Sequence, residues 1–167
     1  AAADVTGACH LAANEGLCFM GVTPGNNGFV LTDEQRAEIL ANDRKSNEVI
    51  RPFLIGRDVN RDVDQRATRW IIDFSAMEKE EAERFEGAMR HVRTDVYPIR
   101  KNNRREAYAK NWWRFVEARS GMRRPIEGLK RVLVIPSVGP WHIVSRQDGV
   151  TCIDHQLMVV ALTHRYH

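Results

Sequence analysis

The sequence predicts a single α+β domain, with a mixed or mainly antiparallel sheet and two to three helices packed on it. The chain has 167 residues, 43% of them hydrophobic, which is enough for one core and short for two. Short alternating or wholly apolar runs, typical of strands, recur along the whole length. Two longer stretches carry apolar residues at helical spacing, and capping signals precede two predicted helices.

The first elements are short. In residues 15–22, successive side chains would point to opposite faces, and both faces are partly apolar, which predicts a strand. After a loop rich in Gly and Asn, residues 29–31 continue an extended run, and the two stretches are expected to form a hairpin. Thr32 and Gln35 have the spacing of a capping box, which predicts a helix that ends near Asn42.

Residues 49–55 form the next apolar run. They contain Pro52, which cannot donate to a ladder, so an edge strand or an extended loop is expected. Residues 56–62 are rich in both charges and predict an exposed polar loop. Residues 69–74 predict a buried strand that pairs with residues 49–55.

A second capping box at residues 75–78 predicts the clearest helix of the chain. Its buried stripe is expected to contain Phe85, Met89, Val92 and Val96. Pro98 is expected to end or kink this helix.

A further helix is predicted over residues 104–118, ending at Gly121. Trp112 fits a core position at helical spacing. Trp113 is expected at the surface or in an interface, because two adjacent helical residues cannot both face one core.

The C-terminal third predicts strands and turns. Residues 122–129 allow a short helical turn closed by Gly128, and residues 132–135 a strand that ends at Pro136. Residues 137–140 predict a turn, residues 141–146 a strand, residues 148–149 a tight turn and residues 156–162 a last strand.

Charge is distributed unevenly. The segment 90–131 contains thirteen Lys and Arg against four acidic residues, a net charge of +9, whereas the whole chain carries +3, so the other 125 residues carry −6. Aromatic residues are interspersed among these cations. Such a segment fits a surface that binds a polyphosphate, and it equally fits a solvated helix face.

Several functional classes lack their sequence signals. No apolar run approaches the ~20 residues of a membrane span, and three cysteines without C-x-x-C spacing favour neither a disulfide framework nor a zinc site, so we expect a cytoplasmic protein with no membrane partner. No phosphate-binding Gly-rich loop, nucleophile elbow or metal-binding His motif occurs. His142 and the pair Asp154-His155 are weak candidates for a base or ligand. A nuclease-like cluster of Asp73, Glu78 and Glu80 is weaker still.

Several stretches, taken in order, resemble the target recognition domain of the large type IIG/IIL-like adenine-N6 DNA methyltransferases of restriction-modification and phage-defence systems. The resemblance extends over roughly residues 15–166, and no single motif in it is diagnostic. The stretches are CFMG (18–21), GFVLT (28–32), VIRPFLIGRDVN (49–60), RWIIDF (69–74), HVR (91–93), VYP (96–98), WWRF (112–115), IEGL (126–129) and VIPSV (134–138).

The resemblance implies recognition without catalysis. In this family the recognition domain follows a catalytic domain that binds S-adenosylmethionine and holds the flipped adenine with an Asn-Pro-Pro-Tyr-type motif; neither Asn-Pro-Pro nor Asp-Pro-Pro occurs here. We therefore expect residues 1–14 to be a connector and residues 15–167 to be a recognition domain without catalytic residues, metal or cofactor. S-adenosylmethionine would bind the parent enzyme, and the expected partners are double-stranded DNA and the methyltransferase catalytic domain of the same parent chain.

The resemblance also implies where bases are read. In this family the segment after the strand that ends at Ile135-Pro136 carries base-reading side chains, which gives Ser137, Trp141, His142 and Arg146 as candidates. The apolar run Gly139-Pro140-Trp141 departs from the polar residues expected there. On a strand, His142 and Arg146 would share one face and Trp141 would lie on the other.

Phosphate contacts require cations outside the reading segment. The candidates are Arg57, Arg61, Arg100, Lys101, Arg104, Arg105, Lys110 and Arg114. An alternative function is a protein-interaction or scaffolding domain whose basic face docks on an acidic partner.

Overall fold

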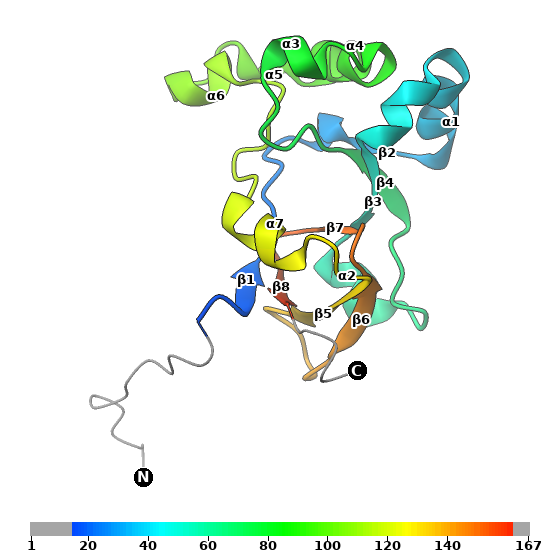
Figure 1. Ribbon diagram of the computed structural model, residues 1–167, viewed down its shortest axis with the longest axis vertical. Coiled ribbons are helices and arrows are strands. Elements are labelled where there is room, and N and C mark those ends of the chain that lie inside the picture. The colour runs from blue at the N-terminus through cyan, green and yellow to red at the C-terminus, as the bar shows by residue number, and fades with distance from the viewer. Residues whose placement is uncertain (1–14, 162–167) are drawn as a thin grey trace.

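Two four-stranded sheets form the centre of the computed structural model, which describes residues 15–161 (Figure 1). One sheet has the order β1-β8-β5-β6 and is antiparallel throughout. The other has the order β2-β4-β3-β7 and is antiparallel except for the β3–β7 pair. The strands are β1 (Cys18–Met20), β2 (Val30–Leu31), β3 (Ile50–Leu54), β4 (Arg69–Ile72), β5 (Arg131–Pro136), β6 (Ser145–Asp148), β7 (Cys152–Ile153) and β8 (Leu157–Val160).

Most helices lie at one end of the molecule. In Figure 1, α1 and α3 to α6 lie along the top of the view, whereas α2 lies near β5 and β6 at the bottom. The helices are α1 (Asp33–Asn42), α2 (Gly56–Arg61), α3 (Lys79–Ala82), α4 (Glu86–Asp95), α5 (Tyr97–Arg100), α6 (Glu106–Lys110) and α7 (Ser120–Ile126), with 3-10 turns η2 (Asn27–Phe29) and η3 (Arg44–Glu48). The predicted α+β class is confirmed.

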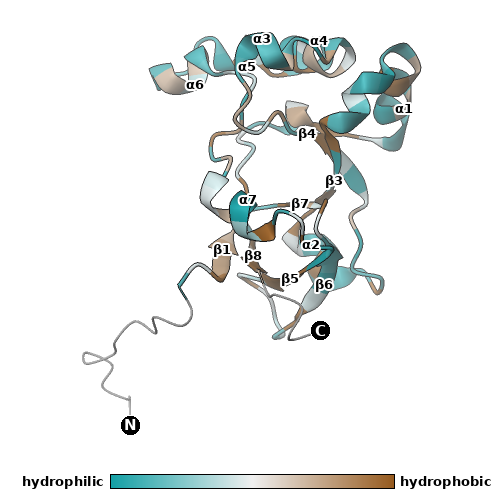
Figure 2. Ribbon diagram, in the orientation of Figure 1, coloured by the Kyte–Doolittle hydropathy of each residue, from teal (hydrophilic) through white to brown (hydrophobic). Residues whose placement is uncertain are grey.

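One hydrophobic core runs through both sheets. The backbone links them just after β1: the Val22 amide donates to the Ile153 carbonyl of β7 at 2.8 Å, and the His155 amide donates to the Val22 carbonyl at 2.8 Å. Phe29, packed against Phe115, belongs to the same buried cluster. Figure 2 shows apolar residues concentrated on β4, β5 and β8 and hydrophilic ones on α1 and α3.

The strongest local signals of the sequence are confirmed. The Thr32 hydroxyl accepts from the Gln35 amide, the Gln35 side chain accepts from the Thr32 amide, and α1 ends at Asn42 as expected. The stripe of Phe85, Met89, Val92 and Val96 is buried. The strands predicted at residues 69–74, 132–135 and 156–162 appear as β4, β5 and β8, and β3 pairs with β4 as expected.

The predicted pairing of β1 is wrong. β1 pairs with β8, placing Cys18 opposite Val160, and β2 pairs with β4, so residues 15–22 and 29–31 form no hairpin. The edge position predicted for residues 49–55 is also wrong, because β3 lies between β4 and β7. Pro52 is tolerated there because β7 pairs only with Phe53 and Leu54, one residue later.

Residues 56–61 form a helix, α2, within the stretch 56–62 that the sequence predicted to be an exposed loop. The buried Asp58 carboxylate accepts from the Ile55 amide at 3.1 Å and pairs with Arg69 at 3.0 Å. Val59, the next residue of the helix, is buried too. A short helix with one buried turn therefore lies between β3 and β4.

The long helix predicted from residue 75 is broken. Ser75 has a left-handed φ of 53° and its amide donates to the Asp73 carboxylate, so it does not cap a helix. α3 and α4 are separated at residues 83–85, and α4 ends before Pro98, as the proline predicts.

The helix predicted over residues 104–118 is limited to α6, and Gly121 lies inside α7 instead of ending a helix. Because the chain leaves the helix after Lys110, the adjacent Trp112 and Trp113 do not occupy successive helical positions. Both are buried, and the indole of Trp113 donates to the Met77 carbonyl at 3.1 Å. The surface position predicted for Trp113 is therefore wrong.

The N-terminus of α4 is capped by η3. The Asp43 carboxylate accepts from the Ser46 hydroxyl at 2.6 Å and from the Gly87 amide at 3.0 Å, and the Ser46 hydroxyl accepts from the Ala88 amide at 2.9 Å. A Cβ at Gly87 would lie 3.0 Å from the Asp43 Cβ, so this approach favours glycine. The hydrogen bond from Ser46 and the one from Gly87 lower the pKa of Asp43 from its ordinary value of 3.8.

We expect the Asp43 cap to make folding sensitive to acid. A carboxylate with a lowered pKa in the folded state stabilises the fold above its unfolded pKa and loses that contribution as pH falls through its folded pKa, here below 3.8. Urea unfolding at a series of acidic pH values should therefore give a shallower loss of stability in Asp43→Asn than in the wild type. An identical pH slope in the two proteins would contradict this role.

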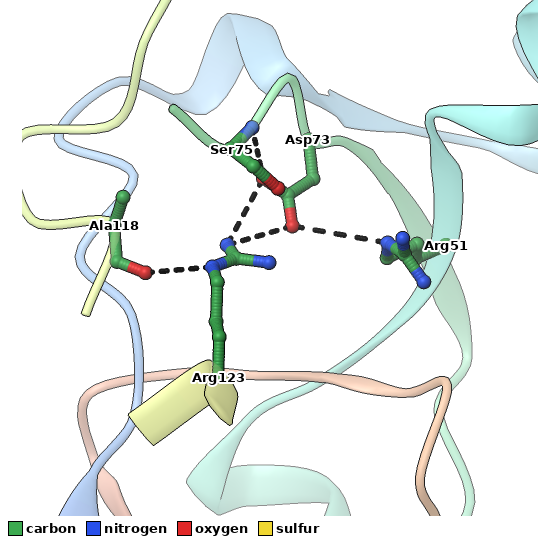
Figure 3. A network of polar contacts seen from close by, with 5 residues as sticks. All are labelled: Arg51, Asp73, Ser75, Ala118 and Arg123. Carbon is green, nitrogen blue, oxygen red and sulfur yellow. Dashed lines mark hydrogen bonds and ion pairs between the residues drawn. The ribbon is translucent and has the colours of Figure 1, made fainter. Parts of the chain in front are cut away.

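The buried carboxylate of Asp73 joins three segments of the chain (Figure 3). The Arg123 guanidinium from α7 contacts its two oxygens at 3.1 and 2.8 Å, and Arg51 from β3 lies 3.9 Å away. The Ser75 amide donates to it at 2.8 Å, and Arg123 also donates to the Ala118 carbonyl. Because the Asp73 side chain is fully buried, this network fixes α7 against the β2-β4-β3-β7 sheet.

Removing Arg123 should destabilise the fold by about 2 to 3 kcal/mol, somewhat less than the usual cost of about 3 to 5 kcal/mol for unpairing a buried charge, because Arg51 stays near the carboxylate. Urea unfolding of Arg123→Ala measures the cost. The matched control is Arg124→Ala, an exposed neighbour on the same helix whose loss should change stability by no more than about 0.5 kcal/mol. An equal loss of unfolding free energy in the two variants would contradict the structural role of the Asp73–Arg123 pair.

Candidate functional site

The candidate residues from the sequence fall into two groups at opposite ends of the molecule. Arg57 and Arg61 lie on α2, close to the loop 137–144 that joins β5 to β6. The other candidate cations lie on or beside α5 and α6, at the top of the view in Figure 1. The structure therefore brings base-reading candidates together with only two of the phosphate candidates.

Helix α2 and the loop 137–144 enclose a cleft of about 750 Å³. Two arginines, one histidine, two amide side chains and one serine are the polar groups of its wall. The lining residues are Met20, Gly56, Arg57, Asn60, Arg61, Ser137, Val138, Gly139, Pro140, His155 and Gln156. We call this the α2 cleft.

The loop is held to the cleft by hydrogen bonds. The Ser137 amide donates to the Gln156 carbonyl at 2.9 Å, and the Asn60 amide group donates to the Val138 carbonyl at 3.2 Å and to the Gly56 carbonyl at 2.9 Å. A Cβ at Gly139 would lie 2.5 Å from the Asn60 side-chain oxygen, so the hydrogen-bonded position of Asn60 favours glycine here. Asn60 and Gln156 were missed by the sequence analysis, since no local signal links them to the loop.

The electrostatics of the α2 cleft favour an anion. Arg57 and Arg61 are exposed, and no carboxylate is among the lining residues in the described part of the chain. His155 is exposed too, with its Nδ1 3.1 Å from the Asp154 carboxylate. Two guanidinium groups in a cleft with no lining carboxylate, next to amide and hydroxyl groups, suit phosphate oxygens and the polar edges of a ligand.

The base-reading candidates occupy different places. Ser137 lines the cleft, whereas Trp141 and His142 lie in the loop, because β6 begins only at Ser145. The predicted strand over residues 141–146 is therefore wrong in its first part, and His142 does not share a strand face with Arg146. Arg146 lies on β6 between the buried Ser145 and Gln147, so it faces outward.

Four of the basic candidates at the other end are exposed: Lys101, Arg104, Arg105 and Lys110. The guanidinium of Arg105 lies 5.4 Å from the ring centre of Tyr108 and donates to its hydroxyl at 3.0 Å. These residues form a basic patch on α5, α6 and the turn between them, which we call the α5–α6 patch.

Arg100 does not belong to this patch. It is only 3% exposed, and its guanidinium donates to the carbonyls of Pro24, Trp112 and Arg114. Burial lowers the pKa of Arg100. The exposed position expected for this residue is wrong, because a guanidinium has enough donors to connect three loop carbonyls inside the core.

Arg114 is also used inside the fold. Its guanidinium donates to the Met77 carbonyl at 2.8 Å and to the Ala76 carbonyl at 2.9 Å, and it pairs with Glu78 at 2.7 Å. Arg114 therefore fixes the turn before α3, and most of its donors are occupied.

A second cavity, of about 470 Å³, lies between α7 and the β3–β7 edge and contains the Asp73 network. Asp73 is committed to Arg123, which removes it from a nuclease-like cluster with Glu78 and Glu80. Burial raises the pKa of the Cys152 thiol, so this wall residue stays protonated.

Two further findings concern residues 15–161. No three His, Cys, Asp or Glu side chains are grouped there in a way that could hold a metal ion. In the same part of the chain, no helix combines the length and apolarity needed to cross a membrane.

No protein family and no curated protein matches the sequence. Among solved structures, the fold is similar to part of the type IIL restriction-modification enzyme MmeI, whose structure was determined in complex with DNA. The TM-score is 0.65 at 14% sequence identity, and the match covers 89% of this chain and 19% of that one, so the chain spans about a fifth of the enzyme's length. At this identity the similarity establishes a shared fold with part of a restriction-modification enzyme.

Proposed function

We propose that this chain is a sequence-specific double-stranded DNA recognition module of a restriction-modification adenine-N6 methyltransferase. The observation that carries the proposal is the α2 cleft, a cationic cleft without lining carboxylates, beside an exposed loop. The similar fold within an enzyme whose structure was solved with DNA supports it. In this function the module places the target adenine for a separate catalytic domain of the same parent chain, where S-adenosylmethionine binds.

The proposed division of labour follows from the chemistry of DNA. Cations that contact phosphates supply affinity on any sequence, whereas discrimination requires side chains that reach base edges in a groove. Arg57 and Arg61 are exposed beside the loop and suit the first role. Ser137, His142 and the outward-facing Arg146 suit the second, since each offers a polar group on the β5–β6 hairpin.

A second candidate function is docking of an acidic protein on the α5–α6 patch. Exposed Tyr97 and Ile99, the latter 66% exposed, lie on α5 beside Lys101. Exposed aromatic and apolar side chains are typical of the centre of a protein interface, and the cations around them would attract an acidic partner. A DNA-binding measurement separates the recognition function from the docking function, because only the recognition function requires the chain to bind DNA.

The first prediction concerns salt. The chain should bind a short mixed-sequence DNA duplex with an affinity that falls steeply as salt rises, by a log–log slope of about 0.9 per phosphate neutralised. Arg57→Ala/Arg61→Ala should flatten this slope, which fluorescence anisotropy with labelled duplex measures at several salt concentrations.

The matched comparison is Arg104→Ala/Arg105→Ala/Lys110→Ala in the α5–α6 patch. If only this variant flattens the slope, the phosphates lie on the patch and not at the α2 cleft. Absence of duplex binding by the wild-type chain at low salt would leave the protein-docking function as the better account.

The second prediction concerns specificity. An Arg that binds a guanine edge with two hydrogen bonds discriminates by about 1 to 3 kcal/mol, whereas an Arg on phosphate contributes equally on every sequence. In the full parent enzyme, Arg146→Ala should therefore relax or shift the methylated sequence at one position, and Arg57→Ala at the α2 cleft should lower methylation uniformly. Sequencing of methylated sites compares them. An unchanged site with a lower rate in Arg146→Ala would limit this residue to backbone contact.

A further inference from the structure

Exposed apolar side chains are concentrated on the loop 137–144 and on the α2 cleft beside it. Of eight exposed large hydrophobic residues in the described chain, three lie in the loop 137–144 and a fourth, Met20, lines the cleft itself. Within the loop, Val138 is 86% exposed and Trp141 is 75% exposed. A solvent-exposed tryptophan next to other exposed apolar side chains forms an apolar patch, and such patches mark contact sites.

The loop that presents these side chains is anchored at both ends. The Ser137 amide donates to the Gln156 carbonyl, and the Val138 carbonyl accepts from the Asn60 side-chain amide. At the other end Ser145 is buried, and its hydroxyl accepts from the Gln147 amide group, which also donates to the Gln65 carbonyl. Because the base of the loop is already ordered, binding at its tip costs little further conformational entropy there.

The charges around the loop indicate the occupant. Residues 137–144 contain no acidic side chain, and the adjacent cleft has Arg57 and Arg61 without a lining carboxylate. A partner here must offer negative charge close to flat apolar surface. Nucleic acid does so, since phosphates lie beside base faces, and aromatic side chains stack on bases.

We infer that Trp141, supported by Val138, is an apolar wedge that stacks on a base step of duplex DNA and partly unstacks it. This inference rests on the proposed function and adds a role to it. Arg57 and Arg61 hold the phosphates on either side while the indole enters the step. Apolar wedges of this kind loosen base pairs next to the step, and a loosened pair is easier to open for a base that must leave the helix.

Tryptophan fluorescence tests the wedge directly. The chain has four Trp residues; Trp112 and Trp113 are buried, and Trp70 is partly buried and donates to the Asp33 carboxylate, which leaves Trp141 as the exposed one. Acrylamide should quench Trp141 in the free chain, and saturation with a short duplex should abolish that accessible fraction. Trp141→Phe should lack the accessible fraction from the start.

The affinity for paired and mismatched duplexes is the second test of the wedge. The wild-type chain should bind a duplex with one central mismatch more tightly than the fully paired duplex, because the mismatched step costs less to unstack. Trp141→Ala should bind the mismatched duplex about tenfold more weakly, a loss within the range for one base–aromatic stack, and should lose the preference. Trp141→Phe should keep most of it. Val150→Ala, an exposed apolar residue that lines the other cavity, is the matched control and should bind both duplexes as the wild type does.

The possible outcomes distinguish failure of the wedge from failure of the DNA-recognition function. If the wild-type chain binds duplex DNA with a steep salt dependence while Trp141 stays open to acrylamide, the wedge is refuted and the recognition function stands. If Trp141→Ala loses affinity equally for paired and mismatched duplexes, Trp141 makes a contact but does not unstack bases, which also refutes the wedge. No DNA binding at low salt refutes both. Unchanged thermal midpoints in the variants confirm that the comparison concerns binding and not folding.

Discussion

The architecture depends on one buried carboxylate, that of Asp73. It receives the Arg123 guanidinium from α7 and the Ser75 amide, with Arg51 of β3 nearby. These contacts fix α7 on the β2-β4-β3-β7 sheet. Because β5 follows α7 after only residues 127–130, the same contacts constrain the start of the β5–β6 hairpin, whose loop lines the α2 cleft. A charge far from the cleft in sequence therefore helps to set the cleft's geometry.

The basic segment 90–131 is divided between structure and surface. Arg100 connects three carbonyls in the interior, Arg114 fixes the turn before α3, and Arg123 balances Asp73. Guanidinium groups suit this use because they offer five donors in a plane and tolerate partial burial better than an ammonium group. The sequence left open a polyphosphate surface or a solvated helix face, and three of its cations do neither. The charge available to a partner from this segment is smaller than its composition indicates.

Signals that depend on neighbouring residues could be predicted, and those that depend on distant ones could not. The Thr32 capping box, the stripe of α4 and the extent of β5 follow from spacing over a few residues. The pairing of β1 with β8 and the burial of Trp113 depend on segments far away in the chain. The α2 cleft also depends on distant residues, because the Asn60 side-chain amide donates to the Val138 carbonyl 78 residues away in sequence. The sequence could therefore nominate Arg57 and Ser137 separately, but not as members of one cleft.

The way the loop is attached bears on how such a site can vary. Its N-terminal anchors use the Ser137 amide and the Val138 carbonyl, which are backbone groups of the loop, and the close approach of Asn60 favours glycine at position 139. Trp141, His142 and Val144 are exposed and can be substituted with these anchors in place, whereas Ile143 packs against the core. For a recognition module, this separates the part that holds the loop from the part that reads a ligand. The exposed side chains of the loop can then change without loss of the Asp73 network or of the core that both sheets share.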